Sequence, residues 1–170
     1  KQVVVASGEL FSDALSAGPL AAQFGGPLLL VRSGELPTAT ADALRVLAPD
    51  SVIVVGGPAT VSDSVLAEIQ AITGAQTTRV GGADRYEVAA NVTRQFFAQA
   101  DAAVLASGLV FPDALSGTPL AHAYGAPILL STATCSSPHT TAAISVLAPA
   151  HKFFVGGPAS VTSSTTQCAS

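Results

Sequence analysis

The stretch 6–16, ASGELFSDALS, returns at 106–116 as ASGLVFPDALS, and this self-match decides the fold. When the sequence is shifted by 100 residues it matches itself without a gap, and 29 of the 70 overlapping positions are identical. Self-similarity at one fixed period is the signature of tandem structural repeats. We therefore predict two repeats, the first at 1–82 and the second at 83–170.

Apolar segments alternate with helical patterns inside each copy. Residues 3–5, 28–31 and 52–55 are short apolar runs without polar alternation, which is typical of strands buried on both faces of a parallel sheet. Helices are expected between them, followed by a fourth strand near 77–80 and a linking helix at 84–98 with Asp84 as its N-cap. The predicted fold class is α/β, with tandem βαβ modules that carry helices on both faces of parallel sheets.

Two loops in each copy are candidates for ligand contact. Parallel sheets bind ligands beyond the carboxyl ends of their strands, and both loops fall at that edge. Glycine lets a ligand approach the backbone, and the start of the following helix favours an anion. The same glycines also serve tight turns when nothing binds. The candidate loop residues are Ser7, Gly8, Gly56 and Gly57, with their copies Ser107, Gly108, Gly156 and Gly157.

Asp13 and Asp113 are the acids that repeat. An aspartate at a helix start caps free amides, so we expect capping, with ligand contact as the second use. No other acid repeats, because Glu9 becomes Leu109 and Asp63 becomes Ser163. The duplicated carboxylate pair that glycoside hydrolysis requires is therefore missing from the pattern.

Other catalytic and metal sites receive little support. A serine hydrolase built from Ser107 or Ser116 with His122 is conceivable, but the first copy has Ala22 where the second has His122. Neither Cys-x-x-Cys nor His-x-x-x-His occurs, and no glycine-rich phosphate loop follows a strand. We predict no catalytic residue, no metal and no cofactor, with the hydrolase kept as an alternative.

The segment 79–87, RVGGADRYE, places two arginines around a Gly-Gly turn. Arginine makes forked contacts to carboxylates and phosphates. Arg79 and Arg85 can therefore bind an anionic polymer, or pair with Asp84, Glu87 or Asp113 and hold the repeats together.

Composition narrows the partners. A net charge of −4 and a pI near 5.1 do not provide the basic face of a nucleic-acid binder, and no apolar run approaches the length of a membrane span. Cys135 and Cys168 both belong to the second copy and have no cysteine counterparts in the first. We predict that they form a disulfide.

The motifs together resemble the cell-wall-binding type 2 repeats of Gram-positive bacteria. The residues that carry the resemblance are 82–87 (GADRYE), 106–108 (ASG), 111–116 (FPDALS), 127–130 (PILL) and 155–157 (VGG). The resemblance implies a Toprim-like or Rossmann-like module that anchors secreted or surface proteins to the cell wall through anionic polysaccharide. It also implies three modules around a pseudo-threefold axis, with enzymatic activity in other domains.

The function expected from the sequence is therefore a non-catalytic wall-binding module, with a structural or interaction domain as the alternative. This chain holds about two copies, and its end drifts into Ser164, Thr165 and Thr166 without a fourth strand. We expect either self-association that completes a three-module ring or an exposed apolar edge. The linking helix, with Tyr86, Val92, Phe96 and Phe97 at helical spacing, is expected to carry the contact between repeats.

Overall fold

A computed structural model describes residues 1–161 and 168 of the chain, so Ser164, Thr165 and Thr166 lie outside the described residues. Strands and helices alternate throughout, as predicted. The first copy and the linking segment contain β1 (Gln2–Ser7), α1 (Phe11–Gln23), β2 (Leu28–Val31), α2 (Thr38–Leu47), β3 (Ser51–Val55), α3 (Asp63–Thr73), β4 (Gln76–Val80) and α4 (Arg85–Phe96). The second copy contains β5 (Ala102–Ser107), α5 (Phe111–Ala123), β6 (Ile128–Ser131), α6 (Pro138–Leu147) and β7 (His151–Val155).

All strand pairs are parallel, and they form two separate sheets. The strand order is β2-β1-β3-β4 in the first sheet and β6-β5-β7 in the second. The register repeats with the sequence, because Val4 pairs with Leu28 in the first sheet and Val104 with Ile128 in the second. The predicted α/β class with parallel βαβ modules is confirmed.

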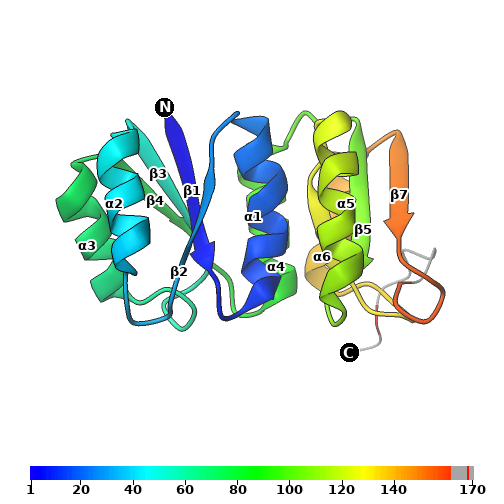
Figure 1. The fold of residues 1–170 in the computed structure, drawn as a ribbon. Coiled ribbons are helices and arrows are strands. Elements are labelled where there is room, and N and C mark those ends of the chain that lie inside the picture. Colours follow the sequence, from blue (N-terminus) through cyan, green and yellow to red (C-terminus); the bar gives the residue numbers. More distant parts are fainter. Residues whose placement is uncertain (162–167, 169–170) are drawn as a thin grey trace.

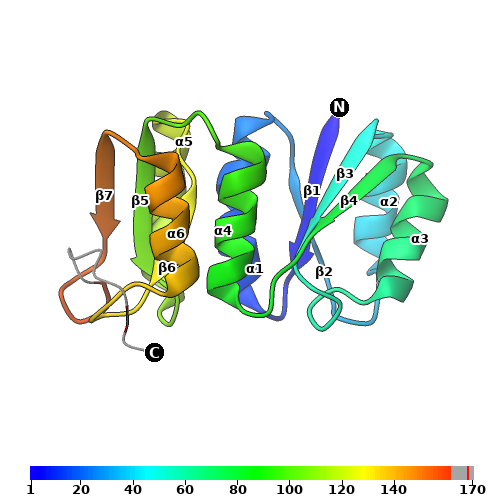
Figure 2. The same ribbon diagram turned by 180° about the vertical axis from the view of Figure 1, so that it is seen from behind.

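The helices form layers around the sheets (Figures 1 and 2). In the first copy, α2 and α3 cover one face of the sheet, and α1 and α4 cover the other face. The second sheet lies between α5 and α6, and the two copies meet where α1 packs beside α5 and α4 beside α6. None of the helices in the described part of the chain is long and apolar enough to cross a membrane.

The equivalent edge strands β2 and β6 differ in burial. Ile128, Leu129 and Leu130 of β6 are fully buried, because α1 of the first copy and the linking helix α4 lie against them. Leu30 of β2, the counterpart of Leu130, is 47% exposed. The helices of one copy thus complete the core of the next copy.

The linking helix α4 contacts both copies, but not through all the residues expected. Val92 and Phe97 pack on the first sheet, whereas Ala89 and Ala90 join the core of the second. Among the four expected residues, Tyr86 alone packs on the second core, and Val92, Phe96 and Phe97 belong to the first. Small residues carry this contact because they let α4 approach β6 closely.

Candidate functional site

In each of the two Ser-Gly loops, the serine hydroxyl is hydrogen-bonded to backbone amides of the same loop. Ser7 Oγ accepts hydrogen bonds from the amides of Glu9 and Leu10, and Ser107 Oγ accepts from the equivalent amides in its copy. Both serines are fully buried. Their hydroxyls therefore hold the loop and are not presented at the surface.

The two Gly-Gly-Pro loops require glycine for backbone reasons. Gly56 and Gly156 adopt φ values of 128° and 129°, in the left-handed half of the map that side chains disfavour. The carbonyl of Gly57 accepts hydrogen bonds from the amides of Thr60 and Val61 and from the Thr60 hydroxyl. Each loop is therefore a preformed turn at the carboxyl edge of its sheet.

Asp13 and Asp113 do not cap their helices, so the expected capping role is wrong. α1 begins at Phe11, its N-cap is Leu10, and no side chain accepts a hydrogen bond there; α5 begins in the same way. Asp13 is directed instead at the Gly-Gly-Pro loop, where its Oδ2 would lie 2.7 Å from a Cβ placed on Gly56. Asp113 holds the same position against Gly156. The acid recurs because both copies pack it against the positive-φ glycine.

Asp13 is the buried member of this pair. Its exposed fraction is 3%, and Oδ2 has no hydrogen-bond partner among the described residues. Burial raises the pKa of the carboxyl above its ordinary value, although the Thr60 hydroxyl and the positive charge of Arg85 partly offset this effect. The ionised form of Asp13 therefore costs folding free energy.

We expect the Asp13→Asn variant to be at least as stable as the wild type at neutral pH. The pKa of Asp13 is raised in the folded state above its unfolded value near 3.8. The protonated carboxyl therefore stabilises the fold at pH values below 3.8, and this stabilisation is lost as the pH rises through the folded-state pKa. Guanidinium unfolding at several pH values between about 3.5 and 7 measures the difference. Asp113→Asn is the matched control, and a wild-type-to-variant difference that does not change with pH would contradict the prediction.

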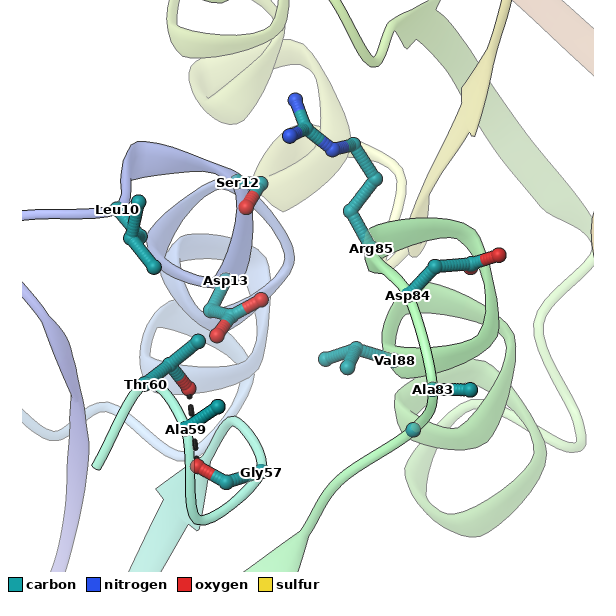
Figure 3. Close-up of a pocket in the computed structure, with 11 residues that line it drawn as sticks. Leu10, Ser12, Asp13, Gly57, Ala59, Thr60, Ala83, Asp84, Arg85 and Val88 are labelled. Carbon is teal, nitrogen blue, oxygen red and sulfur yellow. Dashed lines mark hydrogen bonds between the residues drawn. The ribbon is translucent and has the colours of Figure 1, made fainter. Parts of the chain in front are cut away.

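A pocket of about 310 Å³ lies between the Gly-Gly-Pro loop, the start of α1 and the start of α4. Asp13 and Thr60 lie on one wall, and Arg85 and Val88 lie on the other (Figure 3). The Asp84 carboxylate points away from Asp13 and caps α4 by accepting from the amides of Tyr86 and Glu87, which confirms the predicted N-cap. The lining residues are Leu10, Ser12, Asp13, Gly57, Ala59, Thr60, Gly82, Ala83, Asp84, Arg85 and Val88.

Arg79 and Arg85 have different tasks. The Arg79 guanidinium donates to the carbonyls of Gly56 and Val61 and pairs with Asp63 at 3.0 Å, so it clamps the loop behind the pocket. Arg85 donates to the carbonyl of Gly108 at 2.6 Å. This bond fastens the start of α4 to the second Ser-Gly loop, and the expected pairing of Arg85 with Asp84, Glu87 or Asp113 is not found among the described residues.

Gly108 makes room for the contact between α4 and the Ser-Gly loop of the second copy. A Cβ on Gly108 would lie 2.8 Å from the ring of Tyr86, which reaches across from α4. Gly8 receives no equivalent ring, and its nearest side-chain neighbour is Leu30. The Ser-Gly loop of the second copy is therefore a docking point for α4.

The predicted site residues separate into groups. Asp13, Gly57 and Arg85 line the pocket, with Gly56 and Arg79 directly behind them. Ser7, Gly8, Ser107 and Gly108 do not line it. Asp113, Gly156 and Gly157 form half of an equivalent site that is more open, because Asp113 is half-buried and both glycines are exposed. In the first copy, α4 supplies the second wall.

Thr60 is a pocket residue that the pattern of identical repeated residues does not indicate. Its hydroxyl lies beside Asp13 and closes the turn on Gly57. The signal was present in the repeat, since Thr60 is replaced by Ser160 and the hydroxyl is kept. A comparison restricted to identical residues does not detect this exchange.

The residues of the hydrolase alternative do not assemble. Ser107 is buried before the start of α5, whereas His122 is exposed near the end of that helix, about 16 Å along its axis from Phe111. Ser116 Oγ donates to the carbonyl of Asp113. Within residues 1–161 and 168, no cluster of His, Cys, Asp and Glu side chains could hold a metal ion.

Cys135 and Cys168 form a disulfide, as the sequence predicts. The amide of Cys168 also donates to the carbonyl of Ser136 at 2.8 Å. The bridge fastens the end of the chain to the loop between β6 and α6.

Two α/β repeats, with a pocket between the first Gly-Gly-Pro loop and the starts of α1 and α4, form a tandem module. The family model described as cell wall binding domain 2 (CWB2) matches residues 1–66 and 79–166. The chain therefore belongs to the cell wall binding domain 2 family and is a cell-wall-binding module.

Individual relatives agree with this assignment. The chain is 34% identical over 158 residues to the N-acetylmuramoyl-L-alanine amidase LytC of Bacillus subtilis, covering 93% of the chain and 32% of that protein. It is 35% identical over 128 residues to the amidase enhancer of the same organism, covering 75% of the chain and 17% of that protein. The solved structure of Cwp6 from Clostridium difficile matches with a TM-score of 0.88 and 28% identity, over 95% of the chain and 26% of that protein.

Proposed function

We propose that this module anchors a secreted or surface protein to the cell wall by binding anionic polysaccharide non-covalently. The chain spans less than a third of both curated relatives above, so enzymatic activity in the full-length protein is assigned to other domains. The proposed contact residues are those predicted from the sequence, with Asp13, Gly57 and Arg85 at the centre because they line the pocket.

The observation that carries the proposal is the state of Arg85 at the pocket. Arg85 pairs with no carboxylate in the described part of the chain, and only one of its donors is used, by Gly108. A guanidinium has five N–H donors, so several remain for a carboxylate or phosphate on the polymer. With a net charge of −4, attraction must come from such a local contact and not from the overall charge of the protein.

A wall sedimentation assay tests the proposal. Purified walls are mixed with the protein before and after chemical removal of their anionic polymers. We expect the protein to sediment with intact walls at low salt, to be released as salt rises, and to stay in the supernatant with stripped walls. A protein that stays in the supernatant with intact walls at low salt would favour the alternative, a structural or interaction domain that does not bind polymer.

The exposed apolar surface supports a second part of the proposal, which is self-association toward a three-module ring. The rings of Phe11 and Phe111 pack against each other at a tilt, with centroids 5.3 Å apart, beside exposed Leu30 and Leu115. These side chains surround an apolar groove of about 340 Å³ shared by both copies. We place the boundary between the repeats at residues 82 and 83, in the turn before α4.

We expect the average mass of the isolated chain to rise with concentration in light scattering. The physical reason is that association would bury Phe11, Phe111 and Leu115, which are exposed in the single chain. Leu115→Glu should lower the association, whereas Val46→Glu, at an exposed site on α2, should not. A monomeric mass at every concentration would contradict self-association.

A further inference from the structure

Asp13 is the only charged side chain that is buried within residues 1–161. Its Oδ2 is packed against Gly56 and has no hydrogen-bond partner among the described residues, and the carboxyl group lies at the wall of the pocket (Figure 3). A buried acceptor without hydrogen bonds is unfavourable unless another group satisfies it. The pocket beside Asp13 has a volume of about 310 Å³, which is in the range of small-molecule sites.

The second copy provides an internal comparison. Asp113 Oδ2 makes the same close approach to Gly156, so this packing against glycine belongs to both copies. Asp113 is nevertheless half-buried, and the wall that α4 builds in front of Asp13 has no equivalent in the described part of the second copy. Packing against glycine therefore does not explain why Asp13 faces an enclosed pocket.

The opposite wall carries the complementary charge. Arg85 lines the same pocket and lies over the Phe11 ring at 5.9 Å. The two residues attract electrostatically, but they are not within salt-bridge distance. Asp13 and Arg85 thus line one pocket without a direct ion pair, with the guanidinium turned toward Gly108 and the Phe11 ring (Figure 3). Leu10, Ala59 and Val88 supply apolar surface to the same pocket.

We propose that this pocket binds a single unit of the wall polymer in which hydroxyl groups lie next to an anionic group. Asp13 accepts hydrogen bonds from the hydroxyls, and Arg85 donates to the anionic group. Sugar acids and polyol phosphates share this chemistry. The inference rests on the proposed wall-binding function and assigns the unit of the polymer that the first repeat recognises.

The charge arrangement sets an order of affinities. Sulfate satisfies Arg85 but is repelled by the Asp13 carboxylate, and at neutral pH it has no hydroxyl to donate. A neutral sugar satisfies Asp13 but leaves the donors of Arg85 without an anionic partner. A ligand with both groups is expected to bind at least about tenfold more tightly than either, since one charge-assisted hydrogen bond corresponds to about that factor.

An NMR titration of the whole chain tests this order. The probes are methyl β-D-glucuronide, glycerol phosphate, methyl β-D-glucoside and sulfate, all at equal ionic strength. We expect saturable shifts of the Gly57, Gly82 and Asp84 amides with the glucuronide or with glycerol phosphate. The tighter of these two identifies the source of the anionic unit.

Variants assign the effect to the two walls. Asp13→Asn removes the charged acceptor with little change of shape, and Arg85→Gln removes the cation while keeping a donor for Gly108. Each is expected to weaken binding at least about tenfold, whereas the control Asp42→Asn, at an exposed carboxylate on α2 outside the pocket, should bind as the wild type does. If Asp13→Asn does not fold, Arg85→Gln and the comparison of probes on the wild type still decide the question.

Several results would overturn the proposal. These are equal affinity for sulfate or for the glucoside, equal effects of Asp13→Asn and Asp42→Asn, and no saturable shift with any probe. If the wild type sediments with walls but binds no probe, the pocket assignment fails and the wall-binding function stands. If it binds the glucuronide or glycerol phosphate but not walls, the wall-binding function fails alone.

Discussion

Gly56→Ala is expected to lower the free energy of unfolding by about 3 kcal/mol. A side chain at φ 128° costs on the order of 1–3 kcal/mol in backbone strain. The new methyl group would also lie 2.7 Å from Asp13 Oδ2 and closer still to Thr60 Oγ1. Asp13 is buried and cannot swing into solvent, so the loop or the start of α1 has to move. Guanidinium unfolding with an unchanged m-value measures the loss.

Two further glycines provide the controls. Gly156→Ala meets the same φ and the same acid contact, but the loop is exposed and Asp113 is half-buried, so a loss of about 1–2 kcal/mol is expected. Gly34→Ala adds a methyl group in open space and should change stability by less than about 0.5 kcal/mol. Equal losses at Gly56 and Gly156 would show that burial of Asp13 adds nothing to the strain.

Removal of the disulfide is the second large effect. Cys135 and Cys168 are 33 residues apart in sequence, and chain entropy for a loop of that size corresponds to about 3–4 kcal/mol of stabilisation. The double variant Cys135→Ser with Cys168→Ser is expected to lose about that much in guanidinium unfolding. Reductant should lower the stability of the wild type by the same amount and leave the double variant unchanged.

A smaller loss would also be informative. If the double variant loses less than about 1 kcal/mol, the end of the chain contributes little to the cooperative unit, and the bridge serves the loop between β6 and α6 locally. Intact mass with and without reductant checks that the bond is present in the purified protein. A mass that reductant does not change would contradict the bridge itself.

The repeat pattern predicted most of the fold because strands, helices and turns depend on nearby residues. The apolar runs and the Asp84 cap were visible in this way, and the structure contains both. The role of Asp13 was not predictable, because capping is judged from neighbours in sequence. Its actual contact is Gly56, which is brought close by the parallel pairing of β1 and β3.

The same limit applies to Arg85 and to the burial of the edge strands. The partner of Arg85 is the backbone carbonyl of Gly108, and every residue has such an acceptor, so no side-chain pattern identifies it. The strands β2 and β6 have nearly the same sequence, LLLV and ILLS, yet only β6 is fully covered. That difference depends on which helices pack from the neighbouring copy.

The coverage of β6 by α1 and α4 makes the two copies inequivalent and gives the array a direction along the sequence. α1 of the first copy and the linking helix α4 cover the β6 edge of the second copy, whereas Leu30 at the β2 edge of the first copy stays 47% exposed. A repeat fused ahead of residue 1 would therefore bury Leu30. A repeat fused behind the second copy would instead be covered by α5, and Leu30 would stay exposed. Closure of the units into a ring would be the exception, because it would cover Leu30 in either case. The order in which the units are joined therefore matters, even though the two copies share 29 of 70 aligned residues.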